Sequence, residues 1–361
     1  MASVKDALRA IDAAGPVEQL GYPVESMSFI NGKGRLLGRM PMAARRPDGL
    51  TARMMSRATL ITTLSHEAET RGVIVHYGKQ FTTATVDPSG VTAKFADGTT
   101  AHGDILIGAD GIHSKVRTLI DPAAMAPRYV PVLNVGGYVP NVKVDVPQRE
   151  FQMQFGTRSF FAWMPAPDGG AIWFANPPME KEPERGVLSG MPDNDWRRWL
   201  HELMRGDVGP SATIIDAAPG PLTGWATYDL PVVKHWHDGR GRMVVIGDAA
   251  HATSPAAGQG ASMALEDAVI LAQCLRDCPD PASAFATFEA LRRDRTEKIV
   301  REGHKSSASK AAGPVARVFR DLILPIIFRR AARDDGNSMM WLQGHHIDFD
   351  ARIAPVALVR S

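Results

Sequence analysis

Two hydrophobic periods alternate along the chain, and together they predict a mixed α/β protein. Leu60, Leu64 and Ala68 recur at every fourth position, which predicts a helix over residues 57–71. Phe151, Met153 and Phe155 alternate with polar residues, which is the period of a half-buried strand. The sequence shows no internal repeat, so the elements are expected to build one continuous arrangement rather than an array.

The first part of the chain predicts short elements joined by turns. Residues 6–14 predict a helix that ends at Gly15 and Pro16. Residues 27–40 predict a hairpin with a tight Asn31-Gly32 turn. Further strands are expected over residues 73–76, 82–87, 91–95 and 105–107, the last of them buried, with a helix starting near Ser114.

From about residue 129 to residue 232 the chain is richer in strands. Phe160–Met164 and Ala171–Ala175 predict two strands, and residues 193–204 predict a helix among them. We expect a β-rich layer with aromatic side chains on at least one face. Residues 243–246 then predict a strand, and residues 260–276 and 281–299 predict two helices, the second with Phe285, Phe288, Leu291 and Ile299 on one face.

The strand over residues 243–246 leads into the segment with the most chemical information. It ends at Gly247-Asp248, and a loop with Pro255 and a Gly258-Gln259-Gly260 turn then start a helix. An aspartate at a strand end can accept hydrogen bonds from ribose or ribityl hydroxyls. A glycine turn lets backbone N–H groups approach an anion, and the helix N-terminus adds positive potential. Taken alone, the pattern fits a plain structural connection equally well.

The same run resembles the glycine-aspartate motif of the class A flavin monooxygenases, the group that includes salicylate and hydroxybenzoate hydroxylases. The match includes Gly247-Asp248, Ala249-Ala250-His251, Pro255, Gly258-Gln259-Gly260 and Glu266-Asp267. The resemblance implies that Asp248 binds the ribityl region of FAD, and that Pro255 and the turn from Gly258 to Ala261 pack by the isoalloxazine. A structural role is favoured for His251 over a general base, because the family needs no acid–base residue there.

Two other segments resemble the same family. Residues 104–117 are similar to its aspartate-glycine motif, in which Asp110 and Gly111 lie by the flavin pyrophosphate and the nicotinamide path, and Ser114 and Arg117 also match. Residues 55–60 are similar to its Arg-x-x-Leu helix start, which implies that Arg57 reaches the cofactor. Without the resemblance, Arg57 would be an ordinary exposed arginine.

The resemblance implies an α/β, FAD/NAD(P)-binding fold of the hydroxybenzoate hydroxylase type with an antiparallel substrate-binding sheet. Residues 1–128 and 233–305 would form a discontinuous FAD-binding domain, and residues 129–232 the substrate domain. The hairpin over 27–40 would join the substrate sheet, and residues 306–361 would form a C-terminal helical segment.

The family's opening Gly-x-Gly-x-x-Gly βαβ unit has no counterpart in this sequence. Gly32-Lys33-Gly34 and Gly239-Arg240-Gly241 both lack the glycine at the sixth position. The fold is therefore expected to be N-terminally incomplete, with FAD held weakly at its adenine end. A start site assigned too late, a piece supplied by another chain, and a relative that has abandoned flavin would each explain this.

Charge and composition narrow the possible functions. The 361-residue chain has a formal net charge of +2, without the basic excess of a nucleic-acid binder. No apolar run approaches the roughly 20 residues of a membrane span, and no signal peptide is visible, so a cytoplasmic protein is expected. Cys274 and Cys278 are expected on one helix face as free thiols, since no further ligands for a metal lie nearby.

The resemblance implies an enzyme that hydroxylates an aromatic or polyketide-like small molecule, with FAD as cofactor, NAD(P)H as co-substrate and dioxygen as oxidant. No catalytic side chain is assigned, because the cofactor carries the chemistry. The competing hypothesis is a flavin-free protein that binds a small molecule on the same fold.

Overall fold

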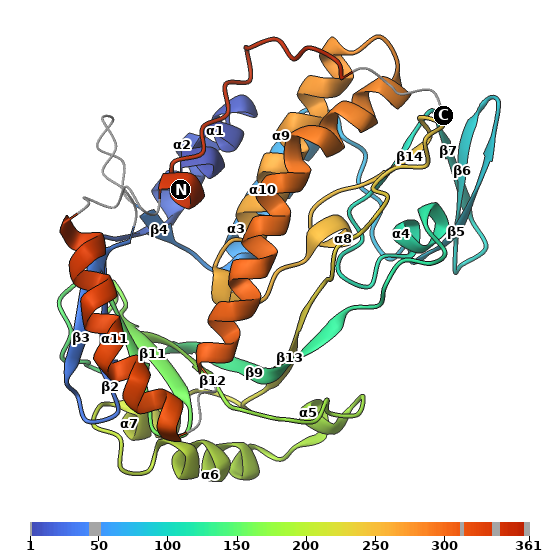
Figure 1. Cartoon of the computed structure of the whole chain (residues 1–361). Coiled ribbons are helices and arrows are strands. Elements are labelled where there is room, and N and C mark those ends of the chain that lie inside the picture. The colour runs from blue at the N-terminus through green and yellow to red at the C-terminus, as the bar shows by residue number, and fades with distance from the viewer. Residues whose placement is uncertain (1, 43–51, 311–313, 334–339, 357–361) are drawn as a thin grey trace.

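The computed structural model describes residues 2–42, 52–310, 314–333 and 340–356. A large sheet forms one half of the molecule, and the long helices α9 (Gly260–Asp277) and α10 (Pro281–Lys310) run side by side in the other (Figure 1). The other helices of the described residues are α1 (Ala2–Ala10), α2 (Ala14–Leu20), α3 (Arg57–Thr70), α4 (Lys115–Ile120), α5 (Val187–Gly190), α6 (Asp193–Met204), α7 (Ser211–Ala217), α8 (Asp248–His251), α11 (Pro314–Arg333), α12 (Met340–Gln343) and the 3-10 turn η1 (Pro255–Ala257).

The strands of the described residues form four sheets. They are β1 (Tyr22–Val24), β2 (Ser26–Asn31), β3 (Leu36–Pro41), β4 (Ala52–Met54), β5 (Phe81–Asp87), β6 (Gly90–Phe95), β7 (Thr100–Gly103), β8 (Leu106–Gly108), β9 (Arg128–Val139), β10 (Glu150–Phe155), β11 (Phe160–Pro165), β12 (Ala171–Asn176), β13 (Gly224–Asp229) and β14 (Met243–Val245). The largest sheet has the order β13-β9-β12-β11-β10-β2-β3 and is antiparallel except where β10 pairs with β2.

Both faces of the large sheet are covered, which corrects the expectation of a half-buried strand at residues 151–155. On one face, Phe161, Trp163 and Trp173 pack against Trp196 and Leu200 of α6. Helices α6 and α7 lie below the large sheet in Figure 1. The other face presents a second apolar cluster around Phe151, Phe160, Ala162 and Met164. Strand β11 is consequently buried at every position. Alternation of residue type detected the strand, but α6 and α7, which cover the Phe161 face of the sheet, come from residues later in the chain.

Strands β2 and β3 form a hairpin at the edge of this sheet, but its turn differs from the tight Asn31-Gly32 turn expected. The Oδ1 atom of Asn31 accepts the backbone N–H groups of Lys33 at 3.1 Å and Arg35 at 3.0 Å. Gly34, rather than Gly32, takes a positive φ of 77°. The asparagine side chain thus organises a longer loop.

Helix α11 packs beside this hairpin, where the Phe29 and Phe328 rings stack with centroids 4.5 Å apart. It belongs to the expected C-terminal helical segment, of which residues 311–313, 334–339 and 357–361 lie outside the described residues.

The N-terminal helix prediction was wrong in its end point. Helix α1 stops at Ala10, the chain turns at Asp12 with a φ of 51°, and α2 then begins at Ala14. Gly15 and Pro16 therefore lie in the first turn of α2 instead of ending a helix. Proline is tolerated there because the first backbone N–H groups of a helix have no intrahelical acceptor.

Two short strand predictions also need correction. Residues 73–76 form no strand in the structure, and Val73 and Ile74 are 56% and 80% exposed. Their β-branched composition is that of a strand, yet no described strand pairs with them. Strand β8 does form, but Ile107 is 39% exposed, because β8 pairs with β14 alone among the described strands.

The long helices differ from expectation in detail. Helix α10 extends to Lys310, beyond the expected end at residue 299. Phe285, Phe288 and Ile299 are buried, but Leu291 is 49% exposed, because it lies about 120° around the helix from Phe285. Cys274 is buried in α9, whereas Cys278 follows the end of that helix, so the two free thiols do not share a helix face.

Within the described residues, no helix is long and apolar enough to cross a bilayer.

Candidate functional site

The two aspartate-containing turns meet at one edge of the small parallel sheet. Strands β8 and β14 pair in parallel, with Val245 opposite Gly108, and the Ile246 N–H donates to the Gly108 carbonyl at 3.0 Å. Because the carboxyl ends of parallel strands share an edge, Asp110 and Asp248 both follow that edge. Segments more than a hundred residues apart are thereby joined.

Gly247 requires its glycine for conformation as well as for space. Its φ of 59° and ψ of −138° are strained for any residue with a side chain, and a Cβ there would lie 3.2 Å from the Cβ of Ala264. Its N–H donates to Oδ2 of Asp267 at 2.8 Å. The chain is therefore fixed immediately before Asp248, the first residue of α8.

Asp248 presents a carboxylate that remains partly accessible to solvent. Crowding by neighbouring atoms desolvates this carboxylate and raises its pKa, while the positive charges of His251 and Arg57 act in the opposite direction. Arg57 is exposed at the start of α3, where the Ser56 side chain caps the helix by accepting the Thr59 N–H at 3.0 Å. Arg57 is thus close enough for its charge to act on Asp248.

The side chain of Asp110 is directed towards α4, the helix that follows it in the chain. Its carboxylate accepts the N–H groups of Lys115 at 2.8 Å and Val116 at 3.2 Å, and also the Ser114 hydroxyl. Gly111 follows with a φ of 78°. Asp110 therefore caps α4 and shapes the turn.

Arg117 connects the two turns through hydrogen bonds from a buried guanidinium group. Its guanidinium is buried and donates to the Ala249 carbonyl at 2.8 Å and to the Ile112 carbonyl at 2.7 Å. Burial lowers the pKa of Arg117, and the charge of Asp110 opposes this effect. This long-range contact links α4 to α8 and holds the relative position of the two aspartates.

The loop after α8 leads into the N-terminus, the positive end, of the long helix α9. Pro255 begins η1, and Gly258 takes a φ of 61° with open space where a Cβ would stand. Gln259 precedes α9 without capping it through its side chain, and its buried Oε1 has no hydrogen-bond partner among the described residues. The first turn of α9, at Gly260 and Ala261, is thus arranged to receive an anionic or electron-rich group.

A buried network of charged side chains lies directly beneath this loop. His251 Nε2 lies 2.6 Å from Oδ2 of Asp267, and Arg292 Nε lies 2.7 Å from its Oδ1. Arg292 also pairs with Glu266 at 2.7 Å, and Arg295 lies 3.0 Å from Glu266. Burial alone would raise the pKa of Asp267, but His251, Arg292 and the Gly247 N–H outweigh it and hold that pKa below its ordinary value.

Sequence reasoning did not assign roles to Asp267 or Arg292 in this network. A carboxylate among the apolar residues of a helix is a detectable signal, because such groups are rarely buried without a partner. The identity of the partners depends on contacts 16 and 25 residues away in the chain. His251 is 3% exposed and bonded to Asp267, so it is part of the support beneath the loop.

Helix α10 connects the loop with the large sheet. A Cβ on Gly303 would lie 2.6 Å from Oγ1 of Thr253 and 2.9 Å from Cβ of Ala257, so the helix packs closely against the loop. One residue later, His304 Nδ1 lies 2.8 Å from the fully buried Asp229, which also pairs with Arg128 at 2.9 Å. The loop and the sheet are therefore positioned by the same helix.

Comparison with known proteins places this arrangement in a family. A family profile described as an FAD binding domain matches residues 7–303. The chain is 32% identical over 233 residues to an FAD-dependent urate hydroxylase of Klebsiella pneumoniae, covering 64% of this chain and 58% of the relative. It is 30% identical over 246 residues to a 6-hydroxynicotinate 3-monooxygenase of Pseudomonas fluorescens, covering 65% and 60%. The chain thus spans about three fifths of the length of these relatives.

Solved structures share the fold. The crystal structure of Klebsiella pneumoniae HpxO complexed with FAD and uric acid superimposes with a TM-score of 0.80 at 24% identity, covering 94% of this chain and 86% of that one. A salicylate hydroxylase substrate complex superimposes with a TM-score of 0.77 at 20% identity, covering 96% and 87%. The expected FAD/NAD(P)-binding fold of the hydroxybenzoate hydroxylase type is confirmed.

Proposed function

The chain belongs to the class A FAD-dependent aromatic monooxygenase family, and from this premise we propose that it hydroxylates an aromatic small molecule with NAD(P)H and dioxygen. The observation that carries the proposal is the convergence of Asp248, the Pro255 loop and the first turn of α9. These groups suit a ligand that combines sugar-like hydroxyls with an electron-rich ring.

The residues present fit FAD. The accessible carboxylate of Asp248 would accept hydrogen bonds from ribityl hydroxyls, and Gly247 fixes the backbone that presents it. The open space at Gly258 would admit a flat ring, with Pro255 beside it and the N–H groups at Gln259, Gly260 and Ala261 directed towards its polar edge. FAD, when bound, would supply the oxygen-transfer chemistry.

Arg57, Asp110 and Gly111 would support the same cofactor from the opposite side. The positive charge of Arg57 already acts on Asp248, and it would equally attract a phosphate group. Asp110 would contribute mainly by shaping the turn at Gly111, because its carboxylate is engaged by the N–H groups of α4.

The face of the large sheet opposite α6 and α7 is proposed as the wall of the substrate pocket. Phe151, Phe160 and Phe174 form an aromatic surface there, with neighbouring ring centroids 5.8 Å apart. Apolar walls of this kind suit a planar aromatic substrate. The relatives are named for urate and 6-hydroxynicotinate, so a small, ring-shaped and polar-edged molecule is the substrate class we propose.

In this assignment, different parts of the chain bind the cofactor and the substrate. Residues 1–128 and 233–305 would bind the cofactor, and residues 129–232 with the hairpin 27–40 would bind the substrate. Residues 306–361 would add the C-terminal helical segment, in which α11 packs against β3.

A turnover assay with isotopic oxygen tests the proposal. The purified protein, supplied with FAD, is incubated with NADH or NADPH, a panel of aromatic acids and purines, and 18O-labelled dioxygen. We expect substrate-stimulated oxidation of the nicotinamide and a product that carries one labelled oxygen atom. Labelled product formed equally by wild type and Asp248→Ala at limiting FAD would leave the activity intact but contradict the site. A protein that takes up no flavin and oxidises no nicotinamide would contradict the function.

A further inference from the structure

Helix α11 presents an apolar face to solvent. It lies beside β2 and β3 at the edge of the large sheet (Figure 1). Among its side chains that the structure describes, seven are exposed, and five of these are large and apolar. The five are Phe319, Leu322, Ile323, Ile326 and Ile327, each between 48% and 60% exposed. Contiguous exposed apolar patches of large side chains mark interaction sites.

The spacing of these five residues makes one continuous stripe. They stand at positions i, i+3, i+4, i+7 and i+8, which share one face of an α-helix. Leu36 of the neighbouring strand β3 is also exposed, and it lines a groove together with Pro325 and Arg329. The apolar surface therefore continues from the helix onto the edge of the sheet.

The opposite face of α11 is already packed, so the helix cannot turn the stripe inwards. The Phe328 ring stacks on Phe29, and its side chain occupies the space where a Cβ of Gly38 would stand. On the same side, Oδ2 of Asp321 accepts a hydrogen bond from the Asn31 side chain at 2.9 Å. These contacts hold the stripe towards solvent.

The charge beside the stripe is positive. The two remaining exposed side chains among those described for α11 are Arg329 and Arg330. Neither forms an ion pair within the part of the chain that the structure describes. The one acid of the helix, Asp321, faces the sheet, where it pairs with Arg320 at 3.0 Å as well as with Asn31. The outward surface thus combines aliphatic side chains with uncompensated positive charge.

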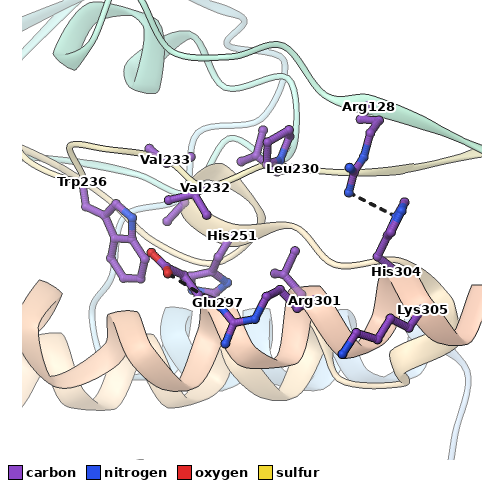
Figure 2. A pocket seen from close by; sticks show the side chains of 13 residues that line it. Arg128, Leu230, Val232, Val233, Trp236, His251, Glu297, Arg301, His304 and Lys305 are labelled. Carbon is purple, nitrogen blue, oxygen red and sulfur yellow. Dashed lines mark hydrogen bonds and ion pairs between the residues drawn. The ribbon is translucent and has the colours of Figure 1, made fainter.

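Two exposed cations on α10 provide a contrast. Arg301 lies 4.0 Å from Glu297 (Figure 2), and Lys305 lies 2.9 Å from Glu302. Each of these charges is balanced by an acid one helical turn away. They therefore serve as matched controls for the arginine pair of α11.

Charge and area favour an anionic membrane over a second copy of the chain as the partner of this surface. In a symmetric dimer the same patch meets itself, and the second α11 offers no outward acid for the arginines. About half of five large side chains amounts to roughly 500 Å², below the roughly 800 Å² per partner of a standard protein interface. An anionic bilayer supplies phosphate groups for the arginines and an apolar interior for the stripe.

We propose that α11 docks the protein onto membranes that contain anionic lipids. The apolar stripe would enter the boundary between headgroups and acyl chains, and Arg329 and Arg330 would contact lipid phosphates. The helix would lie along the bilayer surface, since none of the described helices is long and apolar enough to cross it. None of the residues proposed to hold FAD belongs to α11.

Co-sedimentation of the full chain with lipid vesicles tests the charge component. The vesicles are phosphatidylcholine alone or an equimolar mixture of phosphatidylcholine and phosphatidylglycerol. We expect binding to the mixed vesicles that weakens with added salt. Arg329→Gln with Arg330→Gln should weaken it about 10- to 30-fold, since each arginine at an anionic surface contributes about fivefold. Arg301→Gln with Lys305→Gln removes the same charge from α10 and should leave binding unchanged.

The apolar component is tested with a second pair of variants. Phe319→Ser with Ile326→Ser should also weaken binding, whereas Ile74→Ser with Tyr77→Ser, at exposed positions outside α11, should not. Equal binding to both kinds of vesicle, no binding by the wild type, or binding that both α11 variants leave unchanged would overturn the proposal. In sedimentation velocity, a dimer that dissociates in Phe319→Ser with Ile326→Ser, without vesicle binding, would assign the patch to a second copy instead.

Discussion

The Oδ2 atom of Asp267 accepts hydrogen bonds from both His251, at 2.6 Å, and the Gly247 N–H, at 2.8 Å. One buried carboxylate thus sets the backbone on both sides of Asp248. Its second oxygen is held by Arg292 at 2.7 Å, so the arrangement is fixed from three directions. The position of the proposed ribityl-binding residue follows from this network.

Asp267→Asn tests the network through stability. The substitution keeps the shape of the side chain but leaves the buried Arg292 short of one carboxylate. Breaking a buried ion pair in this way is expected to cost about 3–5 kcal/mol in the free energy of unfolding. Urea denaturation followed by circular dichroism measures the loss, with the exposed Asp294→Asn on α10 as the matched control. A loss no larger than that of the control would show that the network contributes little.

The two aspartates at this site should give opposite pH dependences. The pKa of Asp248 is raised by desolvation, so its folded form binds a proton more tightly than its unfolded form, and its ionisation destabilises the fold as pH rises above 3.8. The pKa of Asp267 is lowered in the folded protein. The stability that its ionised carboxylate contributes is therefore present above pH 3.8 and is lost as pH falls through the folded-state pKa.

Asp248→Asn should therefore raise the free energy of unfolding of the cofactor-free protein at neutral pH, by an amount that shrinks as pH approaches 3.8. Urea titrations at several pH values between about 4 and 7 measure this dependence. A gain that is constant with pH, or that grows towards low pH, would contradict the assignment of the shift to desolvation.

Gly303→Ala probes the contact between α10 and the Pro255 loop. The added methyl would lie 2.6 Å from Oγ1 of Thr253 and 2.9 Å from Cβ of Ala257, so the loop must move. Overpacking of this kind costs about 1–3 kcal/mol, and we expect part of that cost to appear as weaker FAD binding. Gly190→Ala, which adds a methyl with no heavy atom within 4 Å, is the control in the same titration. Unchanged affinity in Gly303→Ala would show that α10 does not position the loop.

Much of the fold was accessible from sequence because its signals are local. Helix α6 begins and ends at the residues predicted, and the strands at Phe160 and Ala171 were found from their composition. The family was confirmed, since its motifs lie in short continuous runs. The roles of Asp248 and its neighbours remain proposals.

The errors have two physical origins, contacts between distant segments and one local turn of the chain. Val73 and Ile74 have strand composition, but strand formation requires a neighbour to pair with. A glycine followed by a proline commonly ends a helix. Gly15 and Pro16 instead lie in the first turn of α2, because the chain turns earlier, at Asp12. The partners of Asp267 could not be read from local periodicity, because ion pairs in a core depend on how helices pack.

The most direct test of the account is an FAD titration of wild type, Asp248→Ala and Asp110→Asn, followed by flavin fluorescence. Asp248 is proposed to bind the cofactor with an accessible carboxylate, whereas Asp110 caps α4, a role that asparagine can largely retain. The account predicts that Asp248→Ala loses about 1–3 kcal/mol, or about 5- to 150-fold in Kd, and that Asp110→Asn loses less. Equal FAD affinity in all three proteins would contradict the proposed site.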